Sequence, residues 1–309
     1  MTRFGDFDTL CRDVPSYSWC NLFYRQVQRT SSDILTGDSA DASTAPVGVN
    51  PTCGILKAGS DGSLANIANI IVIALSIFFT AGLIFLANRR KAAVGRVELR
   101  SFLILYFLSL PLQLLSNGAL LEQGSTAIVA LTALHAGTVA ALFWSLLANG
   151  LVATQVVEDG TMSSLIPFHI GAAAFFAATT YIGFDVALGI TDTLGTSTPP
   201  EALRSIPLFV LTSVWPAAAA FLYLVIMCWI VLGVLNEVRP MWYYVLSAVL
   251  FVLSQLAYFL LSHVVCKGTN AKIDGSFIAT LLETAAVGVL YLAWRSITEE
   301  SWDEDAYYQ

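Results

Sequence analysis

Residues 64–88 read LANIANIIVIALSIFFTAGLIFLAN and contain no charged side chain. About 20 consecutive apolar residues are enough for a helix to cross the hydrocarbon core of a bilayer, which is roughly 30 Å thick. Outward from this stretch, further predominantly apolar segments have the same character, at 101–121, 126–154, 164–187, 205–235, 241–265 and 276–296. The sequence therefore predicts an all-α membrane protein, a bundle of seven transmembrane helices.

The composition supports this fold class. Of the 309 residues, 56% are hydrophobic and 12% are charged, whereas an average soluble domain has about 25% charged residues. An ordinary soluble protein is therefore excluded, and the lipid bilayer is the expected environment. The net charge of −7 argues against nucleic acid as a partner, because phosphate binding needs clustered Lys and Arg.

The pattern divides the chain into three regions. Residues 1–62 form an N-terminal tail, residues 63–296 form the seven-helix domain, and residues 297–309 form an acidic C-terminal tail. Within the N-terminal tail, residues 30–49 are rich in Ser, Thr, Asp, Ala and Gly. This composition predicts a flexible linker.

The distribution of basic residues predicts the orientation. The connection after the first span, residues 87–100, contains Arg89, Arg90, Lys91, Arg96 and Arg100. Short loops rich in Lys and Arg face the cytosol, so this loop is expected to be cytosolic. With an odd number of spans, the N-terminal tail is then luminal and the C-terminal tail cytosolic.

The cysteines fit this orientation. Cys228 lies within the fifth span, whereas Cys11, Cys20, Cys53 and Cys266 all fall on the predicted luminal side. An even set of cysteines in an oxidising compartment predicts two disulfides, with three possible connectivities; four unpaired thiols are the alternative. We favour Cys11–Cys20 with Cys53–Cys266, because the second bond would clamp the N-terminal tail onto the loop before the seventh span.

The sequence contains no pattern typical of a catalytic or metal site. The histidines, His135, His169 and His263, lie on three different spans without a His-x-x-x-His or Cys-x-x-Cys pair to support them. No Lys lies in the core of any span, and the longest cytosolic stretch is too short for a nucleotide-binding domain. We therefore expect no enzyme activity, no metal and no cofactor.

Several polar residues nevertheless fall inside the spans, in the outer half or near the middle of the membrane, where they could converge: Gln113, Asn117, His135, Gln255 and Glu283. A charge at the centre of a span costs roughly 2.5–3.5 kcal/mol on insertion scales, so Glu283 should be protonated or paired inside the bundle. The cluster is either a proton or substrate site, or a set of hydrogen bonds that hold the helices together.

Small residues recur on the seventh span at four-residue spacing, at Thr280, Thr284 and Gly288. Gly137 and Ala141 do the same on the third span. Such spacing lets another helix approach closely. These positions are either internal packing seams or docking faces for a helix of a partner protein.

The C-terminal tail ends in an acidic run that contains Asp303, Glu304 and Asp305. This pattern is similar to signals that recruit the vesicle coat exporting cargo from the endoplasmic reticulum, so vesicle-coat cargo receptors are candidate partners. A solvated tail without such a role is the alternative.

Several short strings, spread nearly from end to end of the chain, resemble one family, the fungal chitin synthase export chaperones of the endoplasmic reticulum. The matching strings are Phe4-Gly5-x-Phe7-Asp8-x-x-Cys11 with Cys20, Pro51-Thr52-Cys53, Ala93-Val94-Gly95-Arg96-x-Glu98, Glu158-Asp159-Gly160-Thr161, Cys266, Asp274-Gly275-x-Phe277 and Trp294-x-Ser296-Ile297-Thr298.

The resemblance implies a multi-pass, non-enzymatic membrane chaperone that binds chitin synthase in the endoplasmic reticulum and allows its export to the plasma membrane for synthesis of wall chitin. Because adjacent cytosolic loops present opposite charges, a docking surface for the synthase is expected at Gly95, Arg96, Glu98, Glu158, Asp159 and Gly160. The alternatives are a seven-helix receptor or sensor, and a small lipid or solute transporter whose path would be lined by His135, Gln255 and Glu283.

Overall fold

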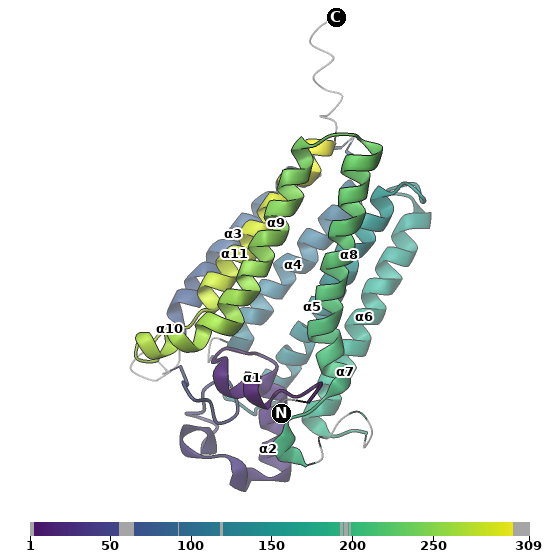
Figure 1. Cartoon of the computed structure of the whole chain (residues 1–309). Helices are drawn as coiled ribbons and strands as arrows, with labels where there is room; N and C mark the ends of the chain where they lie inside the picture. The colour runs from purple at the N-terminus through teal and green to yellow at the C-terminus, as the bar shows by residue number, and fades with distance from the viewer. Residues whose placement is uncertain are drawn as a thin grey trace, which may run out of the picture.

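The computed structural model describes residues 3–55, 65–91, 93–117, 120–191, 194, 197 and 199–298. Within these residues, seven helices are long and apolar enough to cross a membrane (Figure 1): α3 (Ile67–Arg89), α4 (Arg96–Asn117), α5 (Thr126–Ala153), α6 (Met162–Leu188), the fifth span Ile206–Val234, the sixth span Arg239–Gly268 and α11 (Ser276–Ile297). The predicted all-helical, seven-span fold is therefore confirmed.

The fifth and sixth spans are not regular α-helices throughout. The fifth runs through α7 (Ile206–Phe209), α8 (Trp215–Trp229) and π-helical segments at Val210–Val214 and Ile230–Val234; the sixth runs through α9 (Arg239–Leu256), a π-helical segment at Ala257–Leu261 and α10 (Ser262–Gly268). A π-helical turn changes the direction in which side chains point and often marks a functional region of a helix. Residues of both spans line the cavity described below.

The helices surround a common interior, with α5 as the most buried of the seven spans. It packs against α4, α6 and α8, whereas α11 packs against α3 and α9. Ala133, Ala136 and Ala140 on α5 are fully buried, and such small side chains allow close approach of neighbouring helices. In Figure 1, α8 and α9 lie in front of α4.

A compact cap covers one end of the bundle (Figure 1), built from α1 (Asp8–Asp13), α2 (Cys20–Thr30) and two short 3₁₀ helices, Ser32–Ile34 and Gly37–Ala40. Helix α2 packs against α5 and α6, because its side chains Leu22, Phe23 and Tyr24 are fully buried in a shared core. The end of α11 lies at the opposite end of the bundle.

The segment 30–49 differs from the linker that its composition predicted. Leu35, Ala45 and Val49 are buried in the core of the cap. The hydroxyl of Tyr24 donates a hydrogen bond to the Ser39 carbonyl oxygen over 2.8 Å. Gln123 Nε2 donates a hydrogen bond to the Gly48 carbonyl oxygen, also over 2.8 Å. Spaced apolar residues therefore fix a segment whose overall composition is polar.

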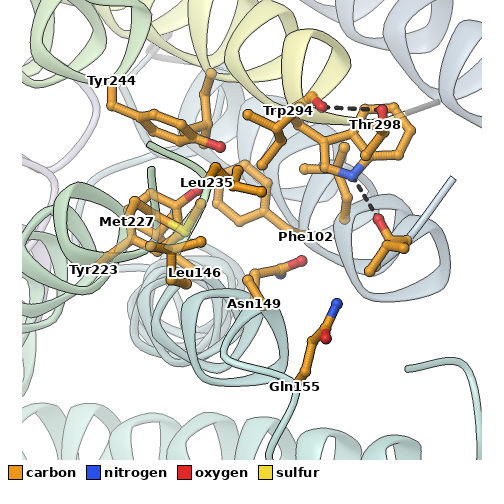
Figure 2. Close-up of a pocket in the computed structure, with 17 residues that line it drawn as sticks. Phe102, Leu146, Asn149, Gln155, Tyr223, Met227, Leu235, Tyr244, Trp294 and Thr298 are labelled. Atoms are coloured by element: carbon orange, nitrogen blue, oxygen red, sulfur yellow. Dashed lines mark hydrogen bonds between the residues drawn. The ribbon is translucent and has the colours of Figure 1, made fainter. Parts of the chain in front are cut away.

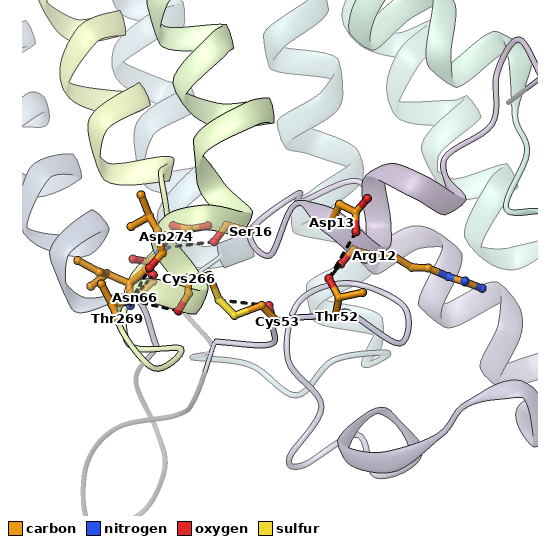
Figure 3. Close-up of a disulfide and its surroundings, with 11 residues drawn as sticks. Arg12, Asp13, Ser16, Thr52, Cys53, Asn66, Cys266, Thr269 and Asp274 are labelled. Atoms are coloured by element: carbon orange, nitrogen blue, oxygen red, sulfur yellow. Dashed lines mark hydrogen bonds between the residues drawn. A yellow bond between two sulfur atoms is a disulfide. The ribbon is translucent and has the colours of Figure 1, made fainter.

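Two disulfides hold the cap. They join Cys11 to Cys20 and Cys53 to Cys266, with Cα–Cα distances of 5.6 and 6.3 Å, within the usual range for this bond. This is the pairing favoured from the sequence, and Cys228 is free. The second bond ties the cap to α10, at the end of the sixth span (Figure 3).

A polar node lies beside this disulfide (Figure 3). Asn66 Nδ2 lies 2.7 Å from Asp274 Oδ1, 2.8 Å from Ser276 Oγ and 3.1 Å from Ser16 Oγ. The cap, the start of the first span and the start of the seventh span therefore meet at one buried amide.

Candidate functional site

A cavity of about 680 Å³ lies inside the bundle, between α4, α5, α8, α9 and α11. All the intramembrane polar residues that the sequence singled out line it: Gln113, Asn117, His135, Gln255 and Glu283. These residues come from four different spanning helices, so the structure brings together positions up to 170 apart in the chain (283 − 113). Most of the remaining lining is apolar or aromatic.

The polar residues are connected across helices by hydrogen bonds. Gln255 Nε2 donates to Glu283 Oε1 over 3.0 Å, and Gln113 Nε2 donates to Thr280 Oγ1 over 3.1 Å. Glu283 is therefore held by a neutral amide, and no Lys or Arg lines the cavity among the residues that the structure describes.

Residues of the cap close one end of the cavity. Tyr17, Ser18 and Trp19 line it, and the Ser18 hydroxyl donates to Asn117 Oδ1 over 2.6 Å. The ring of Trp19 lies 5.0 Å from that of His135. Sequence analysis did not select these residues; the aromatic pair on either side of Ser18, next to Cys20, is the signal that could have indicated them.

The segment that closes the cavity, residues 16–19, also packs against the sixth span. The ring of Tyr17 packs against those of Tyr258 and Phe259, at 6.1 and 5.9 Å, and the Tyr258 hydroxyl donates to the Ser16 carbonyl oxygen over 2.7 Å. Burial raises the pKa of the Tyr17 phenol, so this side chain stays neutral. The cap thus forms a wall of the cavity.

A second, smaller cavity of about 130 Å³ lies near the other end of the bundle (Figure 2). Tyr223 and Tyr244 line both cavities and stand between them, with their rings 6.2 Å apart. The Trp294 indole donates to the Val94 carbonyl oxygen over 2.9 Å. This bond joins the end of α11 to the first loop, next to Gly95, which also lines the small cavity.

The expected docking surface turns out to be partly a contact between two loops of this chain. The Gly95 amide donates to Asp159 Oδ2 over 2.9 Å, and the Gly160 amide donates to Glu98 Oε1 over 3.0 Å. Both glycines have a φ of +68°, a left-handed conformation that favours glycine. Glu98 is fully buried, so its expected role at a partner surface is wrong: it fixes the loop after α5. Arg96 is half-buried and Glu158 exposed.

The small-residue positions on α11 are an internal seam. Thr280 Oγ1 donates to Asn69 Oδ1 over 3.1 Å, and Thr284 Oγ1 donates to Ser76 Oγ over 2.8 Å. At Gly288, an added Cβ would lie 3.0 Å from the Phe79 ring. The docking role considered for these three residues is therefore corrected, because α3 already occupies this face of α11.

The small-residue positions on the third span, α5, also form an internal seam. An added Cβ at Gly137 would lie 2.7 Å from the carbonyl oxygen of Phe176 and would also meet the Thr180 side chain. Helix α6 therefore occupies this seam. The remaining predicted feature, the acidic run Asp303, Glu304 and Asp305, lies outside the described residues.

The fold and the site define a seven-span helical membrane protein with a disulfide-bonded cap and an enclosed polar cluster. Among the described residues, no group of His, Cys, Asp and Glu is arranged to hold a metal ion. Residues 3–307 match the chitin synthase export chaperone family, and the chain belongs to that family. This protein is therefore an export chaperone and not an enzyme, as the resemblance implied.

Curated relatives agree with this assignment. A chitin synthase export chaperone of Chaetomium globosum is 29% identical over 96% of this chain and 83% of the relative. Those of Coccidioides immitis and Neurospora crassa are each 26% identical, covering 96% and 97% of this chain and 83% and 78% of the relatives. No solved structure matches the chain.

Proposed function

We propose that this protein binds a chitin synthase in the membrane of the endoplasmic reticulum and allows its export to the plasma membrane. The observation that carries this proposal is the family match over residues 3–307. The bundle offers long lipid-facing helices on which spans of a client can pack by van der Waals contact and interhelical hydrogen bonds.

Affinity capture of the full chain in mild detergent, followed by peptide identification, tests this function. A chitin synthase at near-equal abundance is the expected result. Normal delivery of every chitin synthase to the surface of cells that lack this protein would contradict it.

The proposed orientation places the cap in the lumen and the first loop in the cytosol. Two features at opposite ends of the bundle support it. The disulfides lie at the cap end, and disulfides persist in oxidising compartments such as the lumen. The basic residues Arg89, Lys91 and Arg96 lie at the other end, as expected for a cytosolic loop.

We place client docking at this basic end. Arg89 and Lys91 are exposed, and Arg96 Nη1 reaches the Asn88 carbonyl oxygen over 3.4 Å, at the end of α3. With Glu98 buried, the first loop presents mainly positive charge. An acidic cytosolic segment of the synthase is the complementary partner, because opposite charges speed and orient association.

Charge reversal tests the docking surface. Arg96→Glu, alone and with Lys91→Glu, should lower recovery of the synthase in affinity capture. Lys267→Glu, an exposed reversal at the cap end, is the matched control and should leave recovery unchanged. Equal recovery in all variants would remove the first loop from the docking surface.

For the C-terminal tail we propose recruitment of vesicle-coat cargo receptors through Asp303, Glu304 and Asp305. Replacing the three with Asn, Gln and Asn removes their charge at similar size. The expected result is retention of both chaperone and synthase in the endoplasmic reticulum, with capture of the synthase unchanged. Normal exit of the variant would contradict this role.

A further inference from the structure

We propose that the large cavity binds one membrane lipid that has an apolar body and a single hydroxyl head, with the hydroxyl against Glu283 and Gln255. The lipid enters sideways, between the fifth and sixth spans. This inference goes beyond the export function and does not depend on it. Four features of the cavity carry it: its size, its opening, its lining and its polar end.

The size of the cavity suits a small molecule. Ligand pockets measure about 300–1,000 Å³, and this cavity measures about 680 Å³.

The opening faces the bilayer. Several apolar residues of the fifth and sixth spans that line the cavity are strongly exposed: Phe221 on α8 (65% exposed), Val252 and Leu256 on α9 (54% and 47%) and Leu260 in the π-helical segment Ala257–Leu261 (65%). These residues belong to spanning helices. A ligand that passes between them comes from the lipid phase.

The two ends of the cavity are closed by the chain itself. Tyr17, Ser18 and Trp19 form the wall at the cap, and Tyr223 and Tyr244 separate this cavity from the smaller one. A water-soluble ligand would have to displace one of these walls. The lateral opening therefore favours a membrane lipid over a soluble metabolite.

The lining is apolar along most of its length, with aromatic side chains such as Phe143, Phe251 and Tyr258. Burying the apolar body of a lipid against them is favoured by the contacts that a well-packed interior provides. The strongly polar side chains of the lining are the cluster Gln113, Asn117, His135, Gln255 and Glu283. The ligand is therefore asymmetric, with one polar group on an apolar body.

The polar end is matched by a hydroxyl. Glu283 Oε1 accepts a hydrogen bond from Gln255, but its second oxygen has no hydrogen-bond partner among the described residues. A hydroxyl is a hydrogen-bond donor, so it can donate to this free carboxyl oxygen. A sterol and a diacylglycerol both carry such a group.

The test uses the full chain in lipid nanodiscs with two photoreactive probes, a sterol and a diacylglycerol. At least one of the two probes should label peptides of the fifth, sixth or seventh span. The probe that labels shows whether the bound lipid is a sterol or a diacylglycerol. Unlabelled lipid of the same kind should compete, whereas its methyl ether, which cannot donate a hydrogen bond, should compete at least fivefold less well. Labelling by neither probe, or equal competition by the ether, would overturn the proposal.

Two pairs of variants place the ligand. Ala220→Trp puts a large side chain into the cavity, and Ala218→Trp puts it on the exposed outer face of the same helix; only the first should lower labelling, by at least fivefold. Glu283→Gln keeps a hydrogen-bonding oxygen and should retain most labelling, whereas Glu283→Leu should lose it. Equal labelling of the two Trp variants would contradict the site. Loss in the Gln variant would indicate a cationic head and contradict the hydroxyl.

Capture of chitin synthase is measured on the same variants, so that the two proposals are judged separately. Labelling that is lost while capture persists supports the lipid site and shows that client binding does not need it. Labelling at the cavity without any capture also supports the lipid site, but contradicts the export function.

Discussion

The hydroxyl of Ser164 donates a 2.9 Å hydrogen bond to Glu98 Oε1, a carboxyl oxygen that lies in the interior of the protein. The same oxygen accepts the Gly160 amide over 3.0 Å. One side chain at the start of α4 thus fixes both the loop after α5 and the first turn of α6. This end of the bundle is held by polar contacts, in contrast to the disulfides at the other end.

Replacing Glu98 with Leu should destabilise the protein. The Gly160 amide and the Ser164 hydroxyl would lose their acceptor, and an unsatisfied buried group costs about 1–3 kcal/mol. Glu98→Gln keeps an acceptor oxygen in the same place and should lose much less. The check is the thermal unfolding midpoint of detergent-purified protein, and equal midpoints for the two variants would contradict the proposed bonding.

Gly137→Ala should destabilise the bundle by about 1–3 kcal/mol, because overpacking forces neighbouring backbone apart. The new Cβ would lie 2.7 Å from the carbonyl oxygen of Phe176 on α6. Gly82→Ala is the matched control: nothing lies within 4 Å of its added Cβ, and Ala is favoured over Gly in a helix by up to about 1 kcal/mol. The opposite order of unfolding midpoints would refute the seam between α5 and α6.

Thiol counting tests the disulfides. All five cysteines of the chain lie among the described residues, and Cys228 is the free one. Protein denatured without reductant should take up one maleimide tag per chain by intact mass, and protein that is first reduced should take up five. Three or more tags before reduction would show that at least one bond is missing.

A glycosylation reporter tests the orientation. Ala42→Asn creates an Asn-x-Thr sequon with Ser43 and Thr44 in the cap, which are exposed. The expected result is a glycosidase-sensitive mass increase. Val238→Thr makes a sequon with Asn236 between the fifth and sixth spans and should remain unmodified. Modification at the second site alone would reverse the assigned orientation.

The number and type of the spanning helices could be predicted from the sequence because long apolar runs have few alternatives in a chain of this composition. The π-helical segments could not, since Val210–Val214 and Ala257–Leu261 are as apolar as the α-helical residues around them. The packing of residues 30–49 was missed because apolar side chains such as Leu35 and Val49 are few in a stretch rich in Ser, Thr, Asp and Gly.

The convergence of the polar cluster was predictable in part. Assigning Gln255 and Glu283 to similar depths in neighbouring spans made contact between them plausible, and they are hydrogen bonded. Glu98 was misjudged because a carboxyl among basic loop residues is usually solvated, and only the tertiary structure shows that the Gly160 turn folds over it. The role of Trp19 depends on how the cap folds back, which local sequence does not encode.

The bond between Cys11 and Cys20 encloses the interval that carries Tyr17, Ser18 and Trp19 into the wall of the cavity. Formation of this disulfide therefore restricts the segment that closes the cavity at the cap. A newly made chain in which Cys11 and Cys20 are still reduced has all its spans, but the segment that forms this wall of the cavity is not yet held by a disulfide. Reduction of this bond is therefore expected to loosen the wall that closes the cavity at the cap.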